Sequence, residues 1–100
     1  MSQQLIEVES PQPTGYTIYS KNNCPFCTKA KALLQDAHII ECDAYLKEDR
    51  STFLKYMDAY SQTEHRTFPM IFFNGEFVGG FTEAKVHHEK LECFSDRMHI

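Results

Sequence analysis

The chain has 100 residues, 42% of them hydrophobic, and a formal net charge of −4. This length is sufficient for one compact domain with its own core and too short for two domains. The acidic balance disfavours nucleic-acid binding, and we expect neither a signal peptide nor a membrane-spanning segment. Such a chain fits a reducing cytosol, where cysteines are more often catalytic, metal-binding or buried than joined in structural disulfides.

Residues 1–15, which include Pro11-Gln12-Pro13, predict an N-terminal extension ahead of a main domain at residues 16–100. Hydrophobic periodicity and turn residues then predict elements in the order β-α-β-α-β-β-α. They are a strand at 16–20, a helix at about 25–37, a strand at 38–42, a helix at about 48–60, a hairpin of 70–73 and 76–78, and a last helix. This order indicates an α/β fold with a small mixed sheet and helices on both faces.

Particular residues support these elements. Asn74-Gly75 supplies the positive φ angles of a type I′ turn between the hairpin strands. Thr82 is the expected N-cap of the last helix. The expected buried positions are Phe53, Leu54, Met57 and Tyr60 in the second helix, and Ala84, Leu91 and Phe94 in the last one.

Two cysteines lie where the first strand gives way to the first helix, in the run Cys24-Pro25-Phe26-Cys27. The leading N–H groups of a helix lack intrahelical partners and its dipole is positive there, so Cys24 is the candidate thiolate. Lys21 adds a full positive charge nearby, and proline suits the first helical position. Cys27 lies one turn further on. The spacing predicts a reversible redox pair in which Cys24 attacks and Cys27 resolves.

The other cysteines and histidines have plainer interpretations. We expect Cys42 and Cys93 to be buried small hydrophobic residues. His87-His88 falls on the helix face of Ala84 and is expected to be packed or half-exposed. These residues lack a spacing typical of metal ligands, so we expect no metal site.

Three motifs in order give the chain a specific resemblance: Lys21 before Cys-Pro-Phe-Cys, then Thr67-Phe68-Pro69, then Gly79-Gly80-Phe81-Thr82-Glu83. The sequence resembles a dithiol glutaredoxin, from about Tyr16 to Phe94. The resemblance implies a thioredoxin-like fold with a four-stranded mixed sheet flanked by helices. It also implies that the motif proline is cis, which turns the backbone of the preceding residue toward an extended ligand.

The ligand implied by the resemblance is glutathione, acting as the reducing co-substrate. The residues that match the family's glutathione site are Lys21, Phe26, Arg66, Phe68, Pro69, Gly80, Phe81 and Thr82. Lys21 and Arg66 match basic residues near the glycyl carboxylate, which an arginine can bind with two hydrogen bonds. Glu83 is a departure, because glutaredoxins commonly carry Asp at this position beside the γ-glutamyl group.

The resemblance implies a glutathione-dependent oxidoreductase that reduces protein disulfides and glutathione mixed disulfides through Cys24 and Cys27. Two alternatives remain: a redoxin reduced by a flavoenzyme, and a non-catalytic iron–sulfur carrier in which Cys24 and glutathione ligate a cluster bridged between two subunits. In a third, the chain is a partner-binding module whose dithiol is incidental. We expect a cytoplasmic monomer with disulfide-containing or glutathionylated protein partners, among which ribonucleotide reductase is open.

Overall fold

The structure is a computed structural model that describes residues 6–98, with side chains described as far as residue 93. Its elements are β1 Tyr16–Ser20, α1 Pro25–Leu33, β2 His38–Glu41, α2 Asp43–Ser61, β3 Met70–Phe73, β4 Glu76–Gly79 and α3 Phe81–Met98. This is the predicted order, so the predicted fold class is confirmed. None of the described helices is both long and apolar enough to span a membrane.

The four strands form one mixed sheet in the order β2-β1-β3-β4. Strand β1 pairs parallel with β2, with Ile18 opposite Ile39, and antiparallel with β3, with Ile18 opposite Ile71. The β3–β4 turn has positive φ at Asn74 (52°) and Gly75 (85°), as a type I′ turn requires. Because β1 and β3 are central, their side chains are buried on both faces of the sheet.

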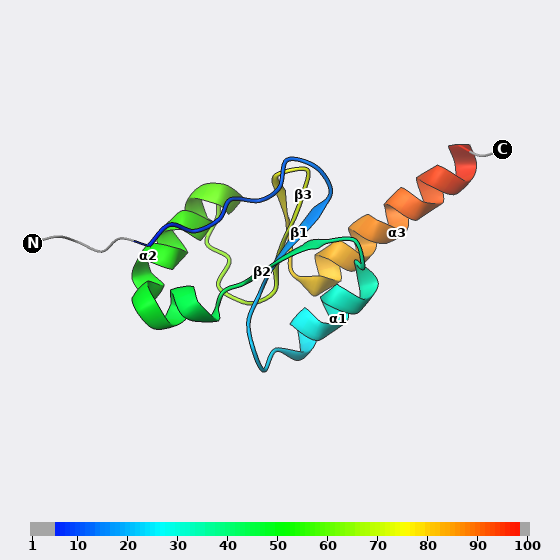
Figure 1. The fold of residues 1–100 in the computed structure, drawn as a ribbon. Helices are drawn as coiled ribbons and strands as arrows, with labels where there is room; N and C mark the ends of the chain where they lie inside the picture. The colour runs from blue at the N-terminus through cyan, green and yellow to red at the C-terminus, as the bar shows by residue number, and fades with distance from the viewer. Residues whose placement is uncertain (1–5, 99–100) are drawn as a thin grey trace, which may run out of the picture.

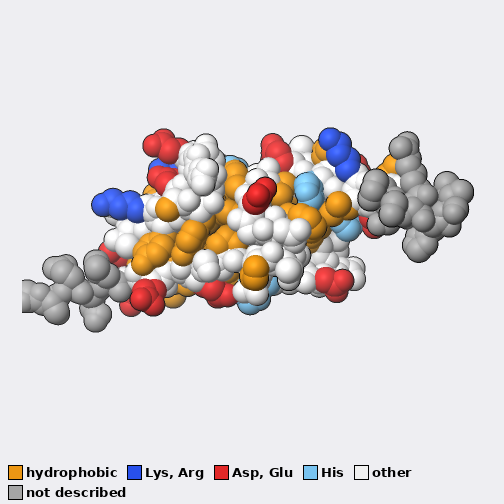
Figure 2. Space-filling view, turned by 90° about the horizontal axis from the view of Figure 1, so that it is seen from above, with side chains coloured by type: hydrophobic (Ala, Val, Ile, Leu, Met, Phe, Trp, Pro, Cys, Tyr) orange, Lys and Arg blue, Asp and Glu red, His pale blue; other side chains and the backbone are white. Residues whose placement is uncertain are grey.

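Helix α2 covers one face of the sheet, and α1 and α3 cover the other (Figure 1). On the α2 side, Phe53 and Met57 pack with Tyr19 and Phe72 in one core cluster. On the other side, α1 and α3 pack on β1 and β3 in a second cluster, whose buried members are Ile18, Ala30, Leu34, Ile71 and Ala84. Figure 2 shows the molecule from above. Hydrophobic side chains form a band across the middle of this face, and most charged side chains lie toward the edge of the face.

The N-terminal segment packs against the α2 side of the domain without forming a helix or strand. Val8 is only 4% exposed and belongs to the α2-side core cluster. Two tyrosine hydroxyls hold the backbone around it: Tyr60 Oη donates to the Val8 carbonyl at 2.7 Å, and Tyr19 Oη donates to the Glu9 carbonyl at 2.6 Å. Residues 1–5 of the expected extension lie outside the described part of the chain. Residues 6–9 therefore belong to the folded unit.

Helix α1 is shorter than predicted, because it ends at Leu33 rather than at Ala37. Leu34 leaves the helical region with φ −106° and ψ 71°, although its N–H still donates to the Ala30 carbonyl at 2.8 Å. The chain then turns, and the Ala37 N–H donates to the Leu34 carbonyl at 3.0 Å. Leu34 is buried although it lies outside the helix, so the apolar periodicity of the sequence continues beyond Leu33. Periodicity alone therefore predicted a longer helix than the structure has.

Helix α2 is longer than predicted and begins at Asp43 rather than at about residue 48. It is kinked at Asp49, whose φ of −159° and ψ of 82° are not helical. The Asp49 carboxylate accepts hydrogen bonds from the N–H (3.1 Å) and hydroxyl (2.7 Å) of Thr52, and these bonds hold its pKa below the usual range. Asp49 thus caps the second half of α2 as an N-cap residue does, close to where the sequence placed the start of the helix.

Helix α3 begins at Phe81, so the prediction that Thr82 is the N-cap is wrong. Glu83 supplies the cap instead, because its Oε1 accepts the Gly80 N–H at 2.9 Å, as the acidic residue of a capping box does. Further along, Ala84 is buried as predicted, whereas Leu91 is 37% exposed rather than part of the core. The side chain of Phe94 lies outside the described residues.

Candidate redox site

The two cysteines of the motif form a disulfide at the start of α1. Cys24 is the N-cap residue, Pro25 occupies the first turn, and the Cys27 N–H donates to Cys24 Sγ at 3.2 Å. Cys24 is partly exposed, whereas Cys27 is 1% exposed. After reduction, the same N–H and the positive end of the helix dipole would favour a thiolate at Cys24. The accessible sulfur of the pair is therefore also the one best placed to carry negative charge.

The segment before β3 runs beside Cys24. The Phe68–Pro69 peptide bond is cis, as the resemblance implied, and the Phe68 carbonyl oxygen lies 3.6 Å from Cys24 Sγ. Within residues 6–98, the Phe68 N–H has no hydrogen-bond partner. The Phe68 ring stacks on Phe53 at 6.1 Å, which holds this backbone in place. A short length of backbone with an unpaired N–H thus lies beside Cys24, where it could pair with an extended ligand.

Aromatic rings and lysines surround this backbone. Phe26 is 51% exposed, its ring centroid is 6.0 Å from that of Phe81, and Lys29 Nζ lies 4.9 Å from the Phe26 centroid. Lys21 Nζ lies 5.8 Å from the Phe68 centroid. The rings offer an apolar surface, and the lysines place positive charge beside it in a chain that is acidic overall.

The glycine pair at the end of β4, Gly79-Gly80, brings the start of α3 close to the cis-proline. A Cβ built on Gly80 would lie 3.7 Å from the Pro69 carbonyl oxygen and 3.5 Å from Glu83 Oε1. At Gly79, with φ +138°, a Cβ would lie 2.8 Å from Glu83 Cβ. Any side chain at Gly79 would therefore displace Glu83, which caps α3. Thr82 is exposed on the first turn of the helix.

Arg66 is the predicted site residue whose surroundings differ most from expectation. Its two terminal nitrogens bind both oxygens of Asp58, with Nη1–Oδ1 at 2.7 Å and Nη2–Oδ2 at 3.1 Å. These bonds hold the pKa of Asp58 below its usual range and raise that of Arg66. The structure thus gives the predicted glutathione-binding arginine a carboxylate partner from its own chain.

The remaining cysteines differ from each other. Cys42 is fully buried, as predicted, and burial raises the pKa of its thiol to about 12. Cys93 is exposed, so the prediction that it is buried is wrong. Cys93 lies in the C-terminal part of α3. Figure 1 shows this end of the helix extending away from the sheet. Among the described residues, no group of three or more acidic, histidine or cysteine side chains is placed to hold a metal ion.

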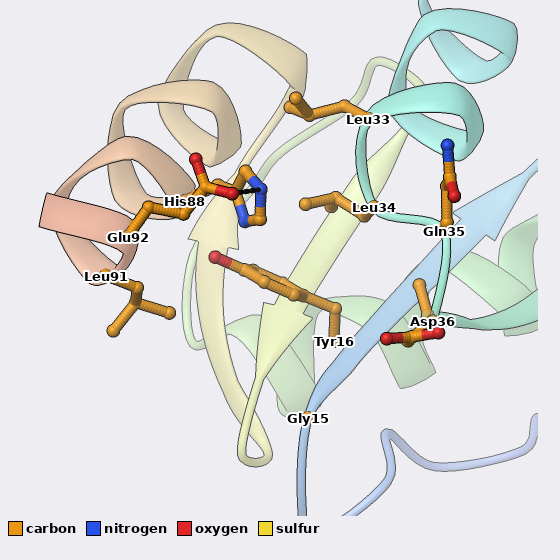
Figure 3. A pocket seen from close by; sticks show the side chains of 10 residues that line it. Gly15, Tyr16, Leu33, Leu34, Gln35, Asp36, His88, Leu91 and Glu92 are labelled. Carbon is orange, nitrogen blue, oxygen red and sulfur yellow. Dashed lines mark ion pairs between the residues drawn. The ribbon is translucent and has the colours of Figure 1, made fainter. Parts of the chain in front are cut away.

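A large groove lies elsewhere, at the far end of α1. It has a volume of about 790 Å³, and its lining includes Tyr16, Leu33, Leu34, His88 and Leu91. Figure 3 shows the Tyr16 ring between the side chains of α1 and α3, below the ion pair of His88 with Glu92. The nine residues of α1 make a helix about 13 Å long, and the disulfide is at its opposite end. The groove is therefore separate from the redox site.

Sequence reasoning missed three contributors to the site. Lys29 is one of three lysines near the motif in the sequence, with Lys21 and Lys31, and nothing in the sequence distinguishes its approach to the Phe26 ring. Glu83 was noted as a departure from the family, but its hydrogen bond to the Gly80 N–H was not predicted. Asp58 carried no signal at all, because acidic residues on an exposed helix surface are ordinary.

Comparison with protein families gives a match to the family model described as glutaredoxin, over residues 16–78. Among curated proteins, human "Glutaredoxin-2, mitochondrial" is 38% identical over 77 residues, which cover 73% of this chain and 44% of the human protein. The chain therefore spans less than half the length of this relative.

Solved structures give the same family. Glutaredoxin 1 from Francisella tularensis, complexed with cacodylate, matches with a TM-score of 0.59 and 33% identity, over 77% of this chain and 94% of that one. A buckwheat glutaredoxin–glutathione complex matches with a TM-score of 0.60 and 23% identity, over 75% of this chain and 68% of that one. The second likeness establishes the fold alone.

Proposed function

This chain belongs to the glutaredoxin family, and from that premise we propose that it is a glutathione-dependent thiol–disulfide oxidoreductase acting through Cys24 and Cys27. One observation carries the proposal. Cys24 Sγ accepts the Cys27 N–H at the start of α1 and lies 3.6 Å from the Phe68 carbonyl. The reactive sulfur thus lies beside backbone suited to binding a peptide thiol.

The reaction begins from the reduced pair. The Cys24 thiolate attacks the glutathionyl sulfur of a mixed disulfide, forming a bond from Cys24 to glutathione and releasing the target as a thiolate, which takes up a proton. The thiolate of a second glutathione then attacks the sulfur of the bound glutathione. Oxidised glutathione leaves, and Cys24 is again a thiolate.

Protein disulfides need the second cysteine. Cys24 first joins one sulfur of the target, and Cys27 then attacks Cys24 Sγ, releasing the reduced target and forming the Cys24–Cys27 disulfide. Two glutathione molecules reduce this disulfide in sequence. Cys27 is buried beneath Cys24, which suits it to attack within the protein rather than to meet a substrate directly.

We place glutathione with its cysteinyl backbone against Phe68 and its γ-glutamyl end at the start of α3. Three observations support this placement: the Phe68 N–H, which is unpaired among residues 6–98, the close approach of Gly80 to Pro69, and the first-turn N–H groups of α3, which have no intrahelical partners. The other contacts are the Phe26–Phe81 pair along the side and the positive charges of Lys21 and Arg66 at the glycyl end. Phe81 and Thr82 are the first residues of that turn.

Stabilising the Cys24 thiolate has a particular benefit. A thiol with a lower pKa is present as thiolate in a larger fraction of molecules, but each thiolate is a weaker nucleophile, with a Brønsted slope of about 0.4–0.5. The two effects on the rate of attack therefore largely cancel. The same stabilisation makes Cys24 a better leaving group when the second glutathione displaces it. We therefore propose that the N-terminus of α1 and Lys21 accelerate chiefly the second step, in which glutathione displaces Cys24.

A steady-state assay tests the proposal, with a glutathione mixed disulfide as substrate and glutathione plus glutathione reductase as electron source. We expect turnover by the wild-type protein and by Cys27→Ser, and none by Cys24→Ser. Activity that requires thioredoxin reductase would favour the flavoenzyme-dependent redoxin, and activity retained in Cys24→Ser would overturn the assignment. A cluster absorption band after anaerobic reconstitution would support the iron–sulfur carrier. Protein targets, with ribonucleotide reductase as one candidate, and a cytoplasmic location are further proposals from the sequence.

A further inference from the structure

Asp58 and Arg66 form a charged pair at the segment that leads into Phe68. Asp58 lies in the last part of α2, and Arg66 lies two residues before Phe68. The two hydrogen bonds, at 2.7 and 3.1 Å, join both carboxylate oxygens to both terminal nitrogens. Asp58 is 34% exposed and Arg66 is 42% exposed, so water and ligands reach both side chains.

A guanidinium group presents five N–H donors in a plane, and a carboxylate on the two terminal nitrogens occupies one edge of it. A second edge, formed by the Nε–H and the other N–H of Nη2, has no hydrogen-bond partner among residues 6–93. A second carboxylate could bind there, but it would share the cation with Asp58 and lie close to a like charge. The hydrogen bonds from Arg66 hold the pKa of Asp58 below its usual range, so Asp58 is negatively charged at neutral pH.

We propose that Asp58 is a specificity-determining residue that competes with the glycyl carboxylate of glutathione for Arg66 and so weakens glutathione binding. The inference rests on the proposed function, which places that carboxylate near Arg66. Because the Asp58–Arg66 pair is exposed, its interaction is modest, and removing the negative charge should change affinity by about two- to five-fold. Asp58 makes no side-chain hydrogen bond to either cysteine among residues 6–93, so the chemical steps at saturating glutathione should be unaffected.

The test compares the KM for glutathione in wild type, Asp58→Asn and Glu48→Gln. Glu48→Gln is the matched control, because it removes one negative charge from an exposed residue of the same helix that makes no side-chain hydrogen bond in the described residues. We expect Asp58→Asn to lower the KM about three-fold with kcat unchanged, and the control to leave both unchanged. An unchanged or raised KM in Asp58→Asn would overturn the proposal, the raised value showing that Asp58 orients Arg66 for binding.

Two further measurements connect the effect to the carboxylate and to Arg66. With glutathione amidated at its glycyl carboxylate, Asp58→Asn should give no advantage, and an equal advantage would contradict the proposal. In an Arg66→Gln background the effect of Asp58→Asn should also disappear. If the wild-type protein turns over with glutathione but these differences are absent, only the role of Asp58 fails. If the wild-type protein has no glutathione-dependent turnover, the proposed function itself fails.

Discussion

Replacing Val8 by alanine tests whether the N-terminal segment is part of the cooperative fold. Val8 is 4% exposed and packs in the α2-side core cluster. Losing its two methyl groups removes about 1.6 kcal/mol of transfer free energy, at about 0.8 kcal/mol per buried carbon. The cavity left behind brings the expected loss of unfolding free energy to about 2 kcal/mol, because a terminal segment can partly collapse into it. For a domain of this size, that loss lowers the Tm by about 8–16 °C.

The assay is urea unfolding followed by the circular dichroism of the helices. Val86→Ala on α3 is the matched control, because it removes the same atoms from a side chain that is 47% exposed. Alanine also favours the helix slightly, so we expect the control to change stability by less than about 0.5 kcal/mol. If Val8→Ala shifts the urea midpoint no more than Val86→Ala, the segment is not part of the cooperative unit, and our account of its tyrosine contacts is wrong.

Three further outcomes follow from the site. Gly79→Ala should destabilise the fold and raise the KM for glutathione, because the new Cβ would displace Glu83, which caps α3. Gly15→Ala is the control and should leave the KM unchanged, because Gly15 also has a positive φ but no neighbouring atom lies within 4 Å of the added Cβ. Lys21→Gln should slow deglutathionylation of the nucleophile more than the first attack in single-turnover kinetics, and equal slowing would contradict this. In the oxidised protein, a thiol reagent at pH 8 should titrate Cys93 rapidly and Cys42 only after denaturation. Cys42 is buried, and with a pKa of about 12 only roughly one part in ten thousand of its thiol is ionised at this pH. Rapid titration of both thiols would contradict this prediction.

The fold was predictable from the sequence wherever one signal dominated. The strands predicted at 16–20 and 70–73 are the observed β1 (Tyr16–Ser20) and β3 (Met70–Phe73). Both are rich in β-branched and aromatic residues, which favour strands buried at the centre of a sheet. Asn74-Gly75 gave the hairpin turn for a stereochemical reason, the positive φ at both residues. Boundaries were harder when local hydrogen bonds competed with periodicity, as at Asp49, where a side-chain cap inside α2 resembled the start of the helix.

The redox pair was also predictable, since the effect of a helix N-terminus on Cys24 depends only on neighbouring residues. The cis bond before Pro69 came from the family resemblance alone, because cis proline is a minority state that sequence composition does not specify. The Asp58–Arg66 pair could not have been predicted, because it joins a helix to a loop through exposed side chains whose orientation depends on tertiary structure. The contacts that modify the site are thus less predictable than the residues that form it.

The central claim is that Cys24, and not Cys27, receives glutathione. The direct measurement is the mass of the Cys27→Ser and Cys24→Ser proteins after brief exposure to oxidised glutathione, each in a Cys93→Ser background so that the exposed thiol on α3 does not react. We expect rapid addition of one glutathione to Cys24 in the Cys27→Ser protein, and little addition to the buried Cys27 in the Cys24→Ser protein. Faster addition to Cys27 would contradict the account.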